Sequence, residues 1–150
     1  MIAGYATVDD DPGSLRPIRW DTNGTIAVLT SPTGGTAQPI AVNNHGTILG
    51  VSSGSPVLWD ARGHLTELRT PGFPETINDD GVIVGYRNRL APPTSDLQAM
   101  RWDTSRHAFA LPYPPGYTSA RAQFLNDHGM IAGYGHKPYD QDHAILWRTQ

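Results

Sequence analysis

The sequence repeats itself, and the repeat constrains the fold more than any other feature. The phrase Asn-x-x-Gly occurs three times, each time followed by a β-rich phrase with glycine at a fixed place. These phrases are TILGV (47–51), VIVGY (82–86) and MIAGY (130–134), and MIAGY also stands at residues 1–5. Self-similarity with a period of about 40 residues predicts an array of like structural units.

All four tryptophans occupy the same place in a second repeated phrase. That phrase reads PIRWD (17–21), PVLWD (56–60), AMRWD (99–103) and AILWR (144–148). A third phrase ends in leucine, as in GTIAVL (24–29). A fourth ends at the asparagine that begins the next Asn-x-x-Gly turn, as in AQPIAVN (37–43). Each unit is therefore expected to have four strands, named a, b, c and d in chain order. Tryptophans at fixed repeat positions pack between neighbouring units more often than they line a sugar-binding ring.

Short turns are expected between strands b and c, and between d and the next a. A four-residue hairpin turn favours Asn or Asp first, where the side chain bonds its own backbone, and Gly last, where φ is positive. Residues 43–46, 78–81 and 126–129 fit this rule, and so do 21–24 and 60–63. Residues 103–106 (Asp-Thr-Ser-Arg) break it, because Arg is strained at positive φ, so a looser turn is expected there.

These phrases predict an all-β fold. Sixteen glycines and thirteen prolines leave few windows with a helical period. Four-stranded antiparallel units of about 40 residues are typical of a β-propeller-like array, and an open β-array or barrel is the alternative. Fourteen strands, or three and a half units, are expected in a single repeat domain of about four blades. The unit boundaries fall at approximately 1–43, 44–78, 79–126 and 127–150.

The order of strands within a sheet is left open by the sequence. Sheets that run d-a-b-c would number four, with the first and the last each lacking one strand. Sheets that run a-b-c-d would give three complete units and half of a fourth. Either order leaves strand edges open, and open edges tend to be paired or covered. The hypothesis is that the two ends meet, or that another chain completes the ring in a homo-oligomer.

At this point the repeat resembles a known family, the HAF-type extracellular repeat. The family pattern is roughly Ile-Asn-x-x-Gly-x-Ile-x-Gly, then Ala-x-x-Trp, then Gly-x-x-x-x-Leu. The segments AVNNHGTILG…PVLWDARGHLTEL and TINDDGVIVGY…QAMRWD are similar to it, and the resemblance covers nearly the whole chain. It implies a propeller-like fold and an exported bacterial protein, and it implies no established chemistry.

Composition narrows the classes of partner. A net charge of −3 without a clustered basic face argues against nucleic-acid binding. No run of about 18 apolar residues is present, so no membrane span is expected. The lack of cysteine rules out disulfides and thiolate metal sites. No Lys/Arg-led apolar segment opens the sequence, which favours a cytoplasmic protein or a mature, trimmed chain over the exported location that the resemblance implies.

Candidate site residues lie in the a–b loops, which vary between units, because function tends to be placed on variable loops. The loop at 135–143 is the richest in ligand-type groups. Two histidines and two carboxylates there would suit a divalent metal or a general acid and base, although their spacing matches no established metal signature. A polar, solvated loop is the simpler interpretation. The candidates are His136, Tyr139, Asp140, Asp142 and His143.

Two other loops carry charged candidates for ligand binding. Asp9, Asp10 and Asp11 precede a Pro-Gly turn and would attract Ca²⁺, but they lack the spacing of a calcium loop. Arg87 and Arg89 alternate along an extended segment, so both are expected to face one anionic partner or the acidic loops. A charged turn and a surface pair are the simpler interpretations.

Two functional hypotheses from different classes follow, beside a purely structural repeat. The first is a non-catalytic binding module that presents the a–b loops to a small molecule, a glycan or a protein. The second is a small propeller enzyme, a lyase, cyclase or hydrolase, in which His136, Asp140 and His143 supply acid–base or metal chemistry. No nucleophile or phosphate-binding motif is present. No cofactor is evident, and a divalent metal is the one cofactor that the residues at 135–143 would allow.

Overall fold

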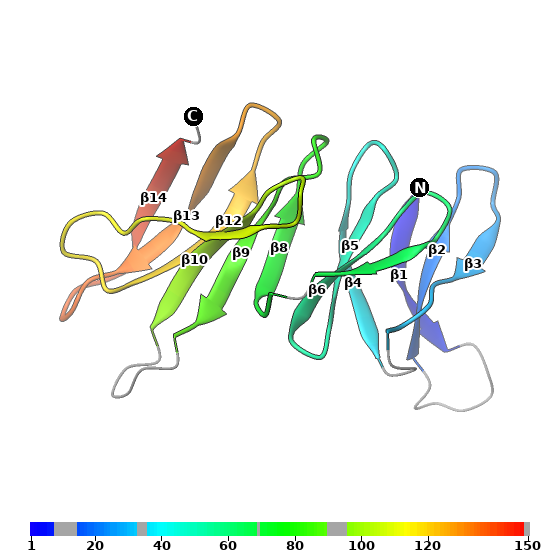
Figure 1. The fold of residues 1–150 in the computed structure, drawn as a ribbon, viewed down its shortest axis with the longest axis horizontal. Coiled ribbons are helices and arrows are strands. Elements are labelled where there is room, and N and C mark those ends of the chain that lie inside the picture. Colours follow the sequence, from blue (N-terminus) through cyan, green and yellow to red (C-terminus); the bar gives the residue numbers. More distant parts are fainter. Residues whose placement is uncertain (8–14, 33–35, 69, 90–95, 149–150) are drawn as a thin grey trace. The chain divides into compact units, whose positions relative to one another are not determined.

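The computed structural model describes residues 1–7, 15–32, 36–68, 70–89 and 96–148. Within these ranges the chain forms fourteen strands and no helix, so the all-β prediction is confirmed (Figure 1). The first seven strands are β1 (Ile2–Thr7), β2 (Leu15–Trp20), β3 (Ile26–Val28), β4 (Ala37–Val42), β5 (Ile48–Ser52), β6 (Ser55–Trp59) and β7 (Leu65–Glu67). The others are β8 (Phe73–Ile77), β9 (Ile83–Asn88), β10 (Leu97–Trp102), β11 (Ala108–Ala110), β12 (Ser119–Leu125), β13 (Met130–His136) and β14 (His143–Arg148).

The strands form four antiparallel sheets, and their order answers the question that the sequence left open. Sheet 1 is β1-β2-β3, sheet 2 is β4-β5-β6-β7, sheet 3 is β8-β9-β10-β11 and sheet 4 is β12-β13-β14. In the repeat's own terms, sheets 2 and 3 run d-a-b-c. Among the described residues, sheet 1 has no d strand and sheet 4 has no c strand.

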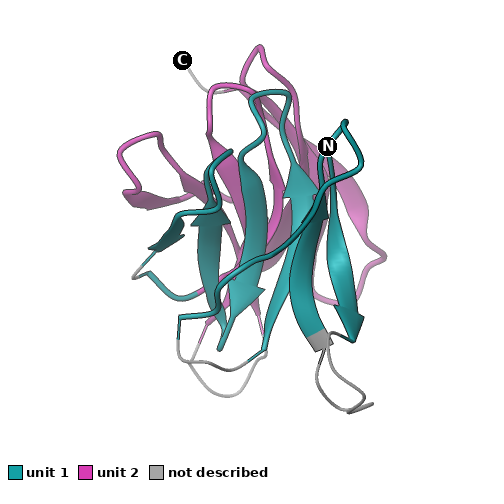
Figure 2. Ribbon diagram, turned by 90° about the vertical axis from the view of Figure 1, so that its right-hand side faces the viewer, with its two compact units in different colours: residues 1–71 teal, residues 72–150 magenta. Residues whose placement is uncertain are grey.

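The chain divides into two compact units, residues 1–71 and residues 72–150 (Figure 2). Unit 1 contains sheets 1 and 2, and unit 2 contains sheets 3 and 4. The repeat pattern continues through residue 71 without a break, so the sequence carries no sign of this division.

The tight turns follow the rule read from the sequence. In the first of them, the Asn43 side chain accepts hydrogen bonds from the backbone N–H groups of His45 (3.1 Å) and Thr47 (2.9 Å). The N–H of Gly46 bonds the carbonyl of Asn43 at 3.0 Å, and Gly46 has a φ of +76°. Positive φ is confirmed for every glycine that ends such a turn, at Gly24, Gly46, Gly63, Gly81 and Gly129.

The turn at 103–106 is not looser than the others, so that expectation is wrong. Arg106 adopts a φ of +70°, and its N–H bonds the carbonyl of Asp103 at 2.9 Å as the glycines do. The Asp103 side chain also accepts the N–H of His107 at 2.8 Å. A hydrogen bond from the Arg106 guanidinium to the carbonyl of Gly81 (3.2 Å) helps to offset the backbone strain.

The glycine at the centre of strand a exists because strand d bulges toward it. Register shifts occur in β4, β8 and β12, each opposite the glycine of the neighbouring a strand. A Cβ atom on Gly50 would lie 2.6 Å from the carbonyl oxygen of Gln38 and 2.6 Å from the Trp59 ring. Gly85 and Gly133 face the carbonyls of Phe73 and Arg121 even more closely. A bulge brings two residues against one, so only glycine fits beneath it.

Each unit buries its own core between its two sheets. In unit 1 this core includes the cluster Leu29, Ala37, Ile48, Val57 and Trp59. In unit 2 it includes the cluster Val84, Ala99, Leu111, Ala120, Ala122, Ile131, Ile145 and Trp147.

Two of the four tryptophans, Trp59 and Trp147, join one sheet of a unit to the next. The indole N–H of Trp59 donates to the carbonyl of Thr30, just beyond β3, at 2.8 Å. Trp147 donates to Pro112, just beyond β11, at the same distance. Packing between neighbouring sheets is therefore confirmed for these two tryptophans.

Candidate functional site

The β13–β14 loop lies at one end of sheets 3 and 4, called here the loop end of unit 2. Strands β9 and β13 end there, and strands β10 and β12 begin there, because the pairs are antiparallel. One hydrogen bond joins the two sheets at this end, because the N–H of Leu97 in β10 donates to the Ser119 hydroxyl in β12 at 2.9 Å. Within sheet 4, the N–H of Thr118 donates to the carbonyl of His136 at 3.0 Å and extends the pairing of β12 with β13.

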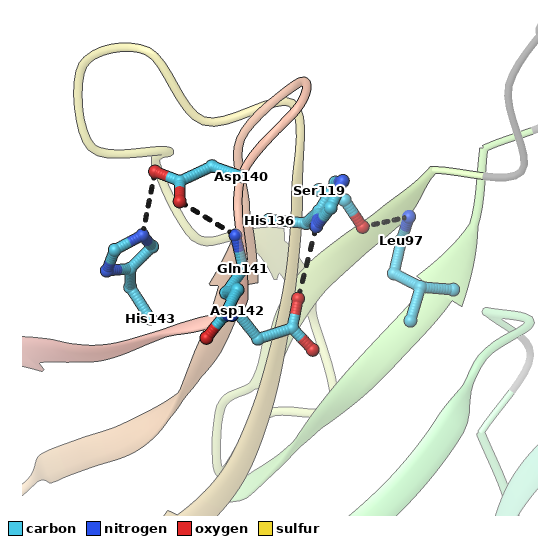
Figure 3. Close-up of polar contacts among 7 residues, drawn as sticks. All are labelled: Leu97, Ser119, His136, Asp140, Gln141, Asp142 and His143. Carbon is cyan, nitrogen blue, oxygen red and sulfur yellow. Dashed lines mark hydrogen bonds and ion pairs between the residues drawn. The ribbon is translucent and has the colours of Figure 1, made fainter.

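The β13–β14 loop positions its histidines and aspartates as two separate pairs (Figure 3). Nδ1 of His136 lies 3.2 Å from the Asp142 carboxylate, and Nε2 of His143 lies 3.0 Å from the Asp140 carboxylate. All four side chains are between two-fifths and three-fifths exposed. Among the residues that the structure describes, no three His, Cys, Asp or Glu gather closely enough to hold a metal ion.

Local backbone geometry explains this pairing. The loop turns through residues 137–140, where the N–H of Asp140 bonds the carbonyl of Lys137 at 3.2 Å. Tyr139 adopts a φ of +64° in this turn and points its ring fully into solvent. The turn places Asp140 beside His143 and leaves Asp142 to reach His136 across the loop.

Hydrogen bonds lower the pKa of Asp140 from its ordinary value of 3.8. The largest cause is the backbone N–H of Gln141, which donates to the carboxylate at 2.8 Å, and the second is the hydrogen bond with His143. Both donors favour the charged carboxylate. The stabilisation is therefore present above the ordinary pKa and is lost as the pH falls through the lowered pKa of the folded state.

The titration of Asp140 tests this arrangement. We expect a midpoint below 3.8 in the native protein, measured by NMR at the side-chain carboxyl carbon. His143→Ala should raise the midpoint, but not to the ordinary value, because the Gln141 N–H remains. His136→Ala is the matched control and should leave it unchanged. A midpoint insensitive to His143→Ala would show that the pair does not form in solution.

A pocket of ≈ 200 Å³ opens beside the His136–Asp142 pair. Its polar lining includes Ser119 and Arg121 from β12, which the sequence analysis did not single out. β12 was interpreted from the sequence only as a d strand of the repeat. One signal could have identified Arg121, because β4 and β8, the matching d strands, carry no arginine. The lining residues are Leu97, Ser119, Ala120, Arg121, Tyr134, Gly135, His136 and Asp142.

Arg121 is held firmly at this pocket. Its guanidinium forms an ion pair with Glu75 and lies 4.5 Å from the centre of the Tyr86 ring. Burial of the guanidinium lowers the pKa of Arg121, because it disfavours the charged form. The hydrogen bond and the attraction to the Glu75 carboxylate outweigh this effect, so the pKa is raised overall. Its Nε is buried and makes no hydrogen bond to the described part of the protein.

Two cation–aromatic contacts lie at the loop end, outside the lining of the pocket. Lys137 lies 4.9 Å from the centre of the Tyr117 ring, and His143 packs edge-on against the same ring at 6.0 Å. Arg89 lies 5.9 Å from the Tyr113 ring, and the Tyr113 hydroxyl donates to the carbonyl of Leu97 at 3.0 Å. Both tyrosines come from the β11–β12 connection, in the segment PYPPGY (112–117).

The sequence also singled out two arginines and three aspartates as candidates for ligand binding. Arg87 is exposed near the end of β9, and Arg89 lies over the Tyr113 ring. That the two arginines bind one anionic partner stays a prediction. Asp9, Asp10 and Asp11 lie outside the described residues.

Comparison with protein-family models, curated proteins and solved structures finds no match to this chain. Within the described ranges, no helix has the length and apolar character needed to cross a membrane.

Proposed function

We propose that this chain is a non-catalytic binding module built as a β-propeller-like array, with its ligand surface at the loop end of unit 2. The observation that carries the proposal is the pocket lined by Arg121, Tyr134, His136 and Asp142. It combines a cation, an aromatic ring, a histidine and a carboxylate in one concave place. Convergent polar groups in a pocket are the usual mark of a binding site. The repeat order d-a-b-c and the resemblance to the HAF-type repeat support the propeller arrangement.

The size of the pocket indicates which class of ligand it suits. At ≈ 200 Å³ it is smaller than the roughly 300–1,000 Å³ of typical small-molecule sites. It fits one protruding group of a larger ligand, such as a sugar ring of a glycan or a side chain of a protein. The neighbouring Tyr113 and Tyr117 rings extend the contact surface beyond the pocket, because tyrosine offers an apolar face with a polar edge.

A binding screen with one matched pair of variants tests the proposal. Wild-type protein is applied to a printed array of oligosaccharides and a second array of immobilised peptides. We expect saturable binding to members of one array, and a loss of about tenfold in affinity for His136→Ala, equivalent to about 1.4 kcal/mol. His128→Ala is the control, because His128 is an exposed histidine in a turn at the opposite end of sheet 4. Equal losses in both variants, or no binding on either array, would contradict the proposal.

A hydrolase is the second candidate function, and one observation favours it. Ser119 pairs in register with His136 and lines the same pocket, and its hydroxyl, which accepts the N–H of Leu97, can also donate its own proton. His136 meets Asp142 through Nδ1, which leaves Nε2 for a base's role as in serine hydrolases. The test is hydrolysis of p-nitrophenyl esters. If the wild type hydrolyses them and Ser119→Ala does not, the hydrolase replaces the binding module as the proposed function.

A further inference from the structure

Strand β1 has the sequence of a strand that is paired on both sides, yet among the described strands it has a partner on one side only. Its first residues, Met1–Tyr5, repeat Met130–Tyr134 letter for letter. The second copy forms β13, which lies between β12 and β14. β1 is paired with β2 alone, and no described strand lies along its other edge.

In the described structure, no bulged strand lies opposite the glycine of β1. A Cβ atom on Gly4 would meet only the Trp20 ring, at 3.3 Å, and no backbone atom within 4 Å. At the matching places, Gly50, Gly85 and Gly133, it would collide with a carbonyl of the bulged d strand. Glycine weakens a strand unless another backbone approaches it closely. Gly4 therefore suits a β1 strand whose free edge pairs with a bulged d strand, and no such strand is among those described.

Exposure of apolar side chains marks the same edge. Ile2 is 65% exposed, whereas Ile48, Ile83 and Ile131 at the matching places are each 0% exposed. Tyr5 is also exposed. An uncovered edge strand that carries apolar side chains is a template for pairing with another polypeptide.

We propose that the free edge of β1 binds an extended segment with this same repeat, from outside the four described sheets, as an added antiparallel strand of the d type. Strand addition to a sheet edge gains its affinity from main-chain hydrogen bonds, and its specificity from alternate side chains. The pairing of β12 with β13 sets the expected register. There Leu125 lies opposite Ile131, and Ala122 lies opposite Gly133 with the bulge beside it. In the added strand, leucine lies opposite Ile2 and alanine opposite Gly4.

A second copy of this chain is a poorer source of the strand. Its d-type strands β4, β8 and β12 are each paired with their own a strand. A copy can donate one only by breaking that pairing and uncovering its own core, which includes Ala37 or Ala120 and Ala122. A segment from outside the four sheets carries no such cost.

The test uses a labelled peptide, TSARAQFLNDHG, which is the sequence of residues 118–129. Its binding to the full chain is followed by fluorescence anisotropy, with a scrambled peptide as control. We expect saturable binding to the wild type and at least about tenfold weaker binding to Gly4→Ala, because the new methyl group would occupy the place of the bulge carbonyl. The fold of Gly4→Ala is checked by far-UV circular dichroism, since its Cβ meets only the Trp20 side chain.

Three results would overturn the proposal. The peptide does not bind the wild type, or it binds no better than the scrambled peptide. It binds Gly4→Ala equally well, which would place it elsewhere, for example in exchange with β12. The wild-type protein forms dimers without peptide and Gly4→Ala does not, which would make a second copy the partner.

Discussion

Gly50→Ala is expected to destabilise unit 1 by about 3 kcal/mol, the upper part of the range for overpacking a tightly filled site. The new Cβ atom would lie 2.6 Å from both the Gln38 carbonyl and the Trp59 ring. Neither neighbour moves easily, because one is backbone in the paired strand β4 and the other is fully buried. Urea unfolding followed by far-UV circular dichroism measures the loss.

Gly4→Ala is the matched control, in the same unit and at the same place in the repeat. Its Cβ atom has no backbone neighbour, so the change should stay within about 1 kcal/mol of the wild type, and alanine's better strand preference offsets the contact with Trp20. Equal losses for the two variants would mean that the bulge of strand d is not what requires the glycine.

Trp59→Ala is expected to cost about 4 kcal/mol, typical of removing a buried aromatic side chain. Trp59 is fully buried among Leu29, Ala37 and Ile48, and its indole N–H satisfies the carbonyl of Thr30. The substitution leaves a cavity between sheets 1 and 2 and strips that carbonyl of its donor.

Trp20→Ala, at the same place in sheet 1, should cost about half as much, because Trp20 is only half-buried. The same urea experiment compares the two variants. If they lose equal stability, the junction between the sheets does not depend on the tryptophan that bridges it.

The sequence allowed the strands and turns to be predicted because the physical rules behind them are local. Asn43 and Gly46 specify a turn through a side-chain hydrogen bond and a positive φ, whatever packs around them. The rule was wrong at Arg106, where bonds to Asp103 and Gly81 hold a non-glycine residue at positive φ. That balance depends on a residue 25 positions away, which no local pattern reveals.

The candidate site was only partly predictable for a related reason. The loop at 135–143 was identified from its density of ligand-type groups, but not the partner that each histidine meets. Pairing of His136 with Asp142 depends on a left-handed residue, Tyr139, that the sequence does not mark. Arg121 reaches the pocket from a strand that is ordinary in the repeat. The position of Arg121 beside Tyr134 follows from the register between β12 and β13. The bulge beside Ala122 shifts that register, and the sequence does not show the shift.

The most direct measurement of the central claim is amide chemical-shift mapping of the ¹⁵N-labelled full chain, titrated with the oligosaccharide or peptide that binds best on the arrays. The account predicts that perturbed amides cluster at the loop end of unit 2, in residues 113–121 and 134–143. Perturbations that cluster instead at the opposite end of the same sheets, in the turns at 103–106 and 126–129, would contradict it.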